Sequence, residues 1–320
     1  MKDINRVFLF GDSWIEGEGV YEKIIEGSGD ILSEPDLPYG DGPGTIREWR
    51  RENGWNKFFR DKYGLKSHQI INKGIQGASN YESFRHLNES LLKDVSSSDL
   101  ILFGFSSKYR DNDCICPAYK QSEERLLGEE NPVEDNDLIS YEKIQITNKS
   151  DDIWPNMKHQ RDTISKDVLE FVDEFNQDYL ATVFDERVYE NMAQMNYMFY
   201  QKLFKKKGIN IIFFDLFESY VDKKFVNPYY DVDESIYITY GKKHYFHQLL
   251  DYERKKYTWK DRYSIWQFGG CFPCGAEEGN YHIPKGNSIA HPNQHGYKVM
   301  FDDISENHID KKYKFNVDNK

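Results

Sequence analysis

The two residues best suited to nucleophilic chemistry are a serine near one end of the chain and a histidine near the other. Ser13 comes after Gly11 and Asp12, directly behind the apolar run Arg-Val-Phe-Leu-Phe at residues 6–10. A serine at the end of a buried strand can point its hydroxyl into a cleft at the sheet edge, where unpaired N–H groups of a helix start can bind an oxyanion. This placement predicts a nucleophile, although a serine here is equally suited to capping a helix.

His291 is the candidate base for that hydroxyl. It is followed by Pro292 and stands ahead of a short amphipathic helix predicted around residues 299–304. Because a free imidazole has a pKa of about 6.5, it is mostly neutral at pH 7 and can accept a proton from a serine. A lone surface histidine is the alternative, and the pairing with Ser13 favours the catalytic role.

Four cysteines form two close pairs, Cys114 with Cys116 and Cys271 with Cys274. This spacing is more typical of metal sites than of disulfides in a chain with no evident leader. If the pairs meet, four thiolates would give a closed tetrahedral zinc site, which is structural because no position stays open for water. Free or buried thiols and disulfides are the alternatives, and no cofactor is expected to be required for catalysis.

The scaffold for these residues is predicted to alternate strands with helices. Short apolar runs that break at Gly, Asn or Asp predict buried strands at 6–10, 69–71, 99–103 and 209–214. Helical patterns lie between them, at about 55–63, 81–92 and 184–207. This alternation implies the α/β class, with a mainly parallel sheet covered on both faces. In such sheets, ligands bind where the strands end.

The last of these helices carries a regular apolar pattern. Its apolar residues recur at spacings of three and four: Phe184, Val188, Met192, Met195, Phe199 and Leu203. Such spacing keeps every member on one face of an amphipathic helix.

Two segments interrupt the alternation, and we interpret them as insertions in a single domain covering residues 1–320. Residues from about 111 to 160 are rich in Asp and Glu with few apolar partners, which favours a solvated surface loop. Residues from about 220 to 285 are rich in Tyr and Trp, which favours a packed subdomain. The alternative for the second segment is a surface that faces carbohydrate or a partner.

The composition argues against several classes of protein. A chain of 320 residues with 38% apolar and 30% charged side chains is expected to fold rather than stay disordered. With 42 Lys and Arg against 54 Asp and Glu, the net charge of −12 disfavours nucleic acid and anionic membranes as partners. No apolar run is long enough for a bilayer helix or a signal peptide, so we expect a location in the cytoplasm or in a virion.

Three short motifs resemble those of one enzyme superfamily. They are Phe-Leu-Phe-Gly-Asp-Ser-Trp at 8–14, Asn-Lys-Gly-Ile-Gln-Gly-Ala-Ser-Asn at 72–80 and His-Pro-Asn-Gln-His-Gly-Tyr at 291–297. In this order, and each after an element of the expected type, they resemble the first, second and last blocks of the SGNH, or GDSL, hydrolases. The matched core runs from residue 6 to about 108 and from about 184 to 305.

The resemblance implies a flavodoxin-like sandwich of three layers, α/β/α, in which Ser13 is the nucleophile and His291 is the base. It also implies an oxyanion hole made of the N–H of Ser13, the N–H of Gly77 and a side chain of the third block, which here is Ser106. Members of this superfamily remove acyl groups from esters, lipids or sugars.

Two positions depart from the family pattern. The third block, Gly-x-Asn-Asp in the family, is Gly-Phe-Ser-Ser at 104–107, so a hydroxyl replaces the amide donor. Losing an oxyanion donor outright costs roughly 3 kcal/mol. The family aspartate lies three residues before the histidine, and that position is Ser288. We therefore expect a Ser–His dyad, unless a backbone carbonyl, Asn287, Glu277 or Glu278 supplies the missing partner.

The preferred hypothesis is a serine esterase that removes O-acyl groups, such as acetyl, from a carbohydrate or similar ester. The aromatic-rich segment suggests the sugar, because Tyr and Trp rings stack on pyranose faces. The alternative is a catalytically weak or inactive binding module, for example a structural part of a phage virion or another larger particle. Phosphate or nucleotide binding ranks last, because residues 11–13 lack the glycine spacing and the lysine of a phosphate loop.

Overall fold

In the computed structural model of this protein, the chain divides into two compact units. One unit consists of Met1–Lys108 with Glu190–Lys320, and the other of Tyr109–Tyr189. The structure describes residues 1–20, 37–38, 42–106, 113–114, 144–145, 186–217, 219–224, 226, 230–256, 291–292 and 294–317. In the second unit, two short strands pair antiparallel, β5 (Asp113–Cys114) and β6 (Ile144–Gln145).

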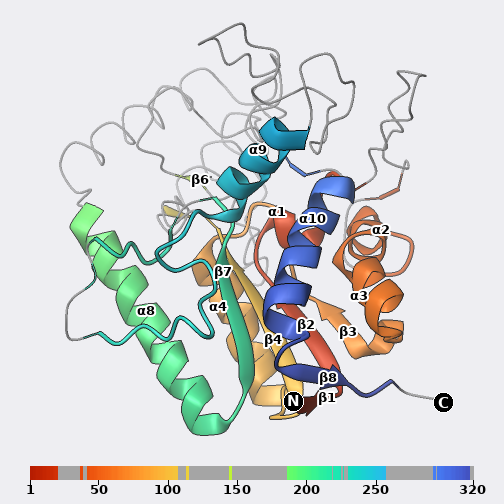
Figure 1. The fold of residues 1–320 in the computed structure, drawn as a ribbon, viewed down its shortest axis with the longest axis horizontal. Helices are drawn as coiled ribbons and strands as arrows, with labels where there is room; N and C mark the ends of the chain where they lie inside the picture. Colours follow the sequence, from red (N-terminus) through yellow and green to blue (C-terminus); the bar gives the residue numbers. More distant parts are fainter. Residues whose placement is uncertain are drawn as a thin grey trace, which may run out of the picture. The chain divides into compact units, whose positions relative to one another are not determined.

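A parallel sheet of four strands forms the centre of the first unit (Figure 1). In spatial order its strands are β3 (Ile70–Asn72), β2 (Arg6–Phe10), β4 (Asp99–Phe105) and β7 (Asn210–Asp215). All three neighbouring pairs are parallel, which confirms the α/β prediction. Every residue of β4 and β7 is buried, and this explains why these strands are continuous apolar runs rather than alternating patterns.

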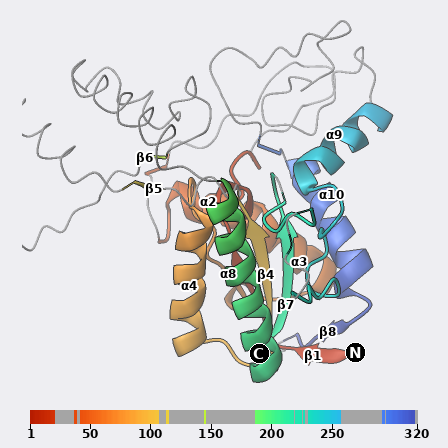
Figure 2. The same cartoon turned by 90° about the vertical axis from the view of Figure 1, so that its left-hand side faces the viewer.

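Helices pack on both faces of this sheet. Alternate strand residues point to opposite faces, so Val7 and Leu9 belong to one buried cluster and Phe8 and Phe10 to the other. The helices that contribute to the first cluster are α3 (Trp55–Tyr63), α9 (Tyr245–Lys256) and α10 (Gln294–Ile304). Those that contribute to the second are α4 (Asn80–Lys93) and α8 (Glu186–Lys207), which stand together in Figure 2.

Shorter elements complete the first unit. They are β1 (Lys2–Ile4), α1 (Ser13–Glu16), α2 (Ile46–Asn53), a 3₁₀ helix (Ser67–Gln69), a π-helical turn (Ser305–Ile309) and β8 (Tyr313–Phe315). β1 and β8 pair in parallel, so segments from the two ends of the sequence lie side by side (Figure 1). Among the described helices, none is long and apolar enough to cross a lipid bilayer.

Local sequence explains where several helices begin and end. Thr45 and Ser79 each accept a hydrogen bond from the N–H three residues later, which caps the starts of α2 and α4. Gly64 ends α3 with a φ of 72°, a left-handed conformation that glycine adopts without strain. These caps satisfy backbone groups that a helix end would otherwise leave unpaired.

Helix α8 forms where the sequence predicts it, but its predicted apolar face does not pack on the sheet. Four of the predicted residues are between 51% and 61% exposed: Val188, Met192, Met195 and Phe199. The buried apolar residues are instead Ala193, Tyr197, Met198, Tyr200 and Phe204. Tyr200 stacks on Phe84 of α4, with 4.3 Å between the ring centroids. Both stripes have helical spacing, and the large tyrosine rings bury more apolar surface, so periodicity alone could not decide between them.

Part of the aromatic-rich segment belongs to the core of the first unit. Tyr237 lies in the buried cluster on the α4 and α8 side of the sheet, and Tyr245 lies in the cluster on the other side. Tyr230 is partly buried against the cluster on the α4 and α8 side. Four other aromatic residues that suggested a carbohydrate surface lie outside the described residues: Tyr229, Tyr257, Trp259 and Trp266.

Tyr237 also hydrogen-bonds a buried carboxylate at the end of β7. Asp215 is fully buried, and its Oδ1 accepts a bond from the Tyr237 hydroxyl at 2.5 Å. Its Oδ2 accepts a bond from the Thr239 hydroxyl at 2.8 Å. These bonds offset the cost of burying the charge. Burial, with a further contribution from Asp215, raises the pKa of the Tyr237 hydroxyl well above 10.

Removing this hydroxyl is expected to change how stability responds to alkaline pH. Because the pKa of Tyr237 is raised in the folded state, the unfolded chain loses the proton first, above about pH 10. Stability is therefore fully present below that pH and falls above it, by up to about 1.4 kcal/mol per pH unit for this tyrosine. In urea unfolding, Tyr237→Phe should be about 1–3 kcal/mol less stable than wild type at pH 8. It should lose less stability than wild type between pH 10 and 11, and equal losses would contradict the argument.

Candidate active site

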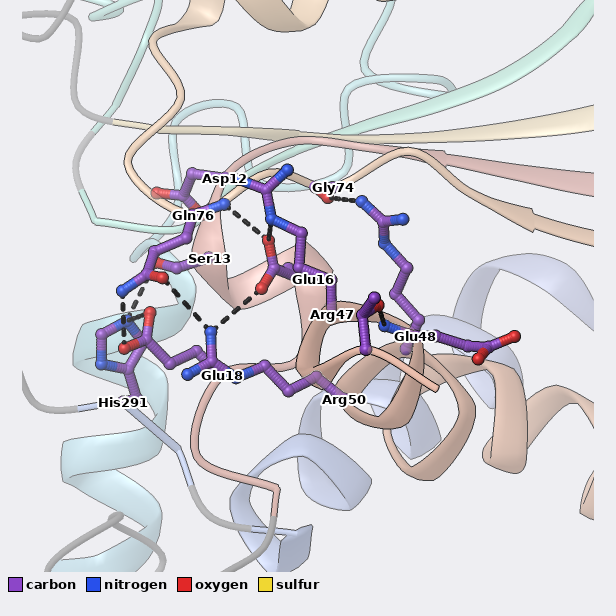
Figure 3. Close-up of polar contacts among 12 residues, drawn as sticks. Asp12, Ser13, Glu16, Glu18, Arg47, Glu48, Arg50, Gly74, Gln76 and His291 are labelled. Carbon is purple, nitrogen blue, oxygen red and sulfur yellow. Dashed lines mark hydrogen bonds and ion pairs between the residues drawn. The ribbon is translucent and has the colours of Figure 1, made fainter. Parts of the chain in front are cut away.

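The structure brings the candidate nucleophile and the candidate base together. The Oγ of Ser13 lies 2.9 Å from the Nε2 of His291, although 278 positions separate the two residues in the sequence (Figure 3). Ser13 begins α1 directly after β2, and His291 stands just ahead of α10. Both side chains are buried. A serine hydroxyl at this distance from an imidazole nitrogen can pass its proton to the ring.

The turn in front of Ser13 holds it in place. The Asp12 side chain accepts a bond from the N–H of Trp14 at 3.0 Å and so caps α1. Gly11 has a φ of 151°, and a Cβ there would lie 2.4 Å from Cγ1 of Ile15. Only glycine therefore allows β2 to turn into α1 this tightly. Among the residues that the structure describes, none accepts a bond from the N–H of Ser13.

The second motif packs directly against α1. The side chain of Asn72 donates to the carbonyl oxygen of Ile15 at 2.8 Å and accepts from the N–H of Gly74 at 2.9 Å. A Cβ on Gly74 would lie 2.3 Å from the backbone nitrogen of Glu16, so the two segments approach more closely than any other residue permits. Gly77 follows with a φ of 74°. Its part in an oxyanion hole stays a prediction.

The predicted oxyanion role of Ser106 needs a correction. Its Oγ donates to Oδ2 of Asp12 at 2.8 Å. Its backbone N–H and carbonyl oxygen both bond to the side-chain amide of Asn80, at 2.8 and 3.1 Å. A hydroxyl carries one proton, so in this arrangement Ser106 does not also donate to an oxyanion. Ser106 instead fixes Asp12, the residue that caps the helix of Ser13.

A charged network that the sequence analysis did not single out lies beside the dyad. Glu16 is fully buried; its Oε1 lies 3.0 Å from Nη1 of Arg50, and its Oε2 accepts from the N–H of Gln76 at 2.7 Å. The side chain of Gln76 accepts from Arg50 at 3.3 Å and donates to Oε1 of Glu18 at 3.0 Å. The other oxygen of Glu18 lies 3.2 Å from Nε2 of His291 (Figure 3). The network thus extends from a buried ion pair to the candidate base.

The sequence signal for this network is weak. Glu16 and Glu18 stand within five residues of Ser13, and Arg50 lies in a polar helical segment further along the chain. Charged residues at such positions are usually solvated. Arg50 is buried because α2 packs against α1, and this contact is not evident from either segment alone.

The dyad rests on the geometry of this chain and on its three motifs. No protein-family model, curated protein or solved structure matches it. The resemblance to SGNH hydrolases is therefore carried by the motif residues, and the distance between Ser13 and His291 is an observation independent of that resemblance.

The cysteine predictions fall mostly outside the described part of the chain. Cys116, Cys271 and Cys274 lie outside the described residues, and Cys114 is described only as the end of β5. Within the part that the structure describes, no group of three or more His, Cys, Asp or Glu residues could hold a metal ion. The zinc site stays a prediction.

Proposed function

We propose that this chain is a serine hydrolase of ester bonds, with Ser13 as the nucleophile and His291 as the base, on a three-layer, flavodoxin-like scaffold of the SGNH type. The observation that carries the proposal is the 2.9 Å distance between Ser13 Oγ and His291 Nε2. The strand order β3-β2-β4-β7 supports the scaffold, because the order of strands reverses between β2 and β4. Ligands bind at this point in sheets of this kind, and Ser13 follows β2.

The geometry supports a reaction in two steps. Ser13 Oγ attacks the acyl carbonyl carbon while its proton moves to Nε2 of His291; the bond to the alcohol then breaks, and the alcohol leaves with that proton. Water next gives a proton to the same nitrogen and attacks the acyl group. Ser13 takes the proton back as the acid departs. The N–H of Ser13 is the donor available to the oxyanion, with Gly77 as the second donor that the family resemblance implies.

We propose O-acylated carbohydrates or similar small esters as the substrate class. The ester rests on the pairing of Ser13 with His291 together with the family resemblance, whereas the sugar rests on the aromatic composition of residues 220–285. Tyr237 and Tyr245 are core residues and are not available for stacking on a sugar. A sugar-binding surface would therefore use other aromatic residues of this segment.

A fluorophosphonate probe tests the nucleophile directly. The wild-type chain is expected to gain one adduct on the peptide that contains Ser13, because a serine activated by an imidazole attacks the phosphorus atom. Ser13→Ala should not be labelled at that peptide, and His291→Ala should be labelled about a hundredfold more slowly. Ser83→Ala, at a buried serine of α4, is the matched control and should be labelled as the wild type is. An unlabelled wild type would overturn the esterase and favour the non-catalytic binding module.

A further inference from the structure

Glu18 places a carboxylate next to the reacting nitrogen of the candidate base. Its Oε2 lies 3.2 Å from Nε2 of His291, the same nitrogen that faces Ser13. Its side chain is 14% exposed. The hydroxyl of Tyr297 donates to the backbone carbonyl of Glu18 at 2.7 Å, and Tyr297 belongs to α10, the helix that follows His291. A contact between α10 and the segment after α1 therefore joins the part of the chain that carries the ring to the part that carries the carboxylate.

Two successive hydrogen bonds, from Arg50 to Gln76 and from Gln76 to Glu18, hold the Glu18 carboxylate in one orientation. Arginine only donates hydrogen bonds, so the bond from Arg50 to Gln76 identifies the oxygen end of that amide. The nitrogen end then faces Glu18, to which it donates at 3.0 Å. Arg50 is held by Glu16, which is fully buried. A buried ion pair thus fixes the amide, and the amide fixes the carboxylate.

The other charged groups around the dyad are already compensated. Figure 3 shows Asp12, Glu16 and Arg50 around Ser13 and His291. Asp12 accepts bonds from the N–H of Trp14 and from a serine hydroxyl, and Glu16 pairs with both Arg50 and Arg47. On α10, His295 is exposed. Glu18 is therefore the carboxylate placed to stabilise the positive charge when the ring of His291 becomes protonated.

A carboxylate in this position favours the charged form of the ring. When His291 takes the proton of Ser13, Nε2–H lies within hydrogen-bond distance of Glu18, and the opposite charges attract. The imidazolium forms both when the serine attacks and when water attacks. Glu18 would therefore lower the energy of the two states in which the base carries a proton. It would also hold a proton on the ring at low pH, where the ring must be neutral to act as a base.

We propose that Glu18 is a positioning residue that supplies the carboxylate partner of His291, held in place by Gln76 and Arg50. This inference rests on the proposed function. It gives the chain a carboxylate at the histidine although the position three residues before it is Ser288. In a Ser-His-Asp triad the carboxylate binds the far nitrogen of the ring, whereas the carboxylate of Glu18 faces Nε2.

The kinetic test compares Glu18→Gln with wild type on p-nitrophenyl acetate across pH. We expect kcat at its plateau to fall about tenfold to a hundredfold while KM changes less than about twofold, because the lost interaction exists only when the ring is charged. We expect the ascending limb of kcat/KM to move to lower pH by about one unit. Glu18→Asp should recover part of the rate. Glu89→Gln, at an exposed position of α4, is the charge-matched control and should behave as wild type.

A second measurement does not depend on turnover. In the Ser13→Ala background, the ¹⁵N resonances of the His291 ring report the pH at which it gains a proton. Adding Glu18→Gln should move that midpoint to lower pH by about one unit, and Glu89→Gln should leave it in place. If Glu18→Gln leaves the titration midpoint of the His291 ring in place, the proposed role of Glu18 is wrong. It is also wrong if Glu18→Gln changes neither kcat nor the ascending limb of kcat/KM. A wild type without ester turnover and without labelling overturns the proposed function instead, so the two failures are distinguishable.

Discussion

Replacing Ser13 with alanine is expected to lower kcat/KM for p-nitrophenyl acetate by at least about 10³-fold, because this removes the oxygen that we propose forms the acyl-enzyme. His291→Ala should have an effect of similar size, since it removes the proposed base that lies 2.9 Å from the Ser13 hydroxyl. The double variant should be no slower than either single variant, because the two residues act as one unit. Initial rates of p-nitrophenolate release measure all three.

The control for this series is Ser83→Ala. Ser83 is a buried serine whose hydroxyl bonds to the backbone carbonyl of Ser79 within α4, so its loss should leave kcat/KM within about twofold of wild type. Far-UV circular dichroism checks that each variant is folded. Wild-type rates in Ser13→Ala would exclude that residue as the nucleophile. Losses that multiply in the double variant would show that the two residues act independently.

Replacing Gly74 with alanine is expected to cost more than about 3 kcal/mol of the free energy of unfolding. An added Cβ would lie 2.3 Å from the backbone nitrogen of Glu16 and 2.6 Å from the carbonyl carbon of Ile15. Both atoms belong to the main chain of α1, so no side-chain rotation can relieve the clash. The variant should also lose ester turnover, because α1 carries Ser13. Urea unfolding monitored by tryptophan fluorescence measures the change.

Gly208→Ala is the matched control for this effect. Gly208 has a φ of 67°, and a Cβ there would meet no atom within 4 Å. Its replacement should therefore cost only the strain of a left-handed alanine, about 1–2 kcal/mol. The difference between the two variants isolates the close approach of the second motif to α1. If Gly74→Ala were as stable as Gly208→Ala, the second motif and α1 would have to lie further apart than they do in the structure.

The sheet could be predicted because its strands are buried on both faces. After a charged first residue, the runs at 6–10 and 99–103 are apolar, and each corresponds to a strand of the sheet, β2 and β4. α2 was not predicted, because Ile-Arg-Glu-Trp-Arg-Arg-Glu-Asn is mostly polar and forms its helix through the Thr45 cap and the packing of α2 on α1. β1 and β8 were not predicted either, because each is only three residues long and the two are stabilised by one another.

The proximity of Ser13 and His291 could be predicted from the sequence, and the surroundings of the two residues could not. Both stand in motifs whose residue types and order predicted that they meet. The Ser106 hydroxyl bonds to Asp12 because the end of β4 lies beside the end of β2. No pattern in the sequence predicts a contact at this level of detail. The same holds for Glu18, whose carboxylate meets His291 because contacts such as that of Tyr297 hold α10 against the segment after α1.

The separation of Ser13 from His291 along the chain has a consequence for how this protein matures. Ribosomes release the serine long before the histidine, and contacts between such distant positions form late because closing a long loop is entropically costly. Until α10 docks, the serine has an ordinary hydroxyl with no imidazole beside it. Ester cleavage would therefore begin only with the last stage of folding, and its onset in a refolding experiment would serve as a clock for the docking of α10.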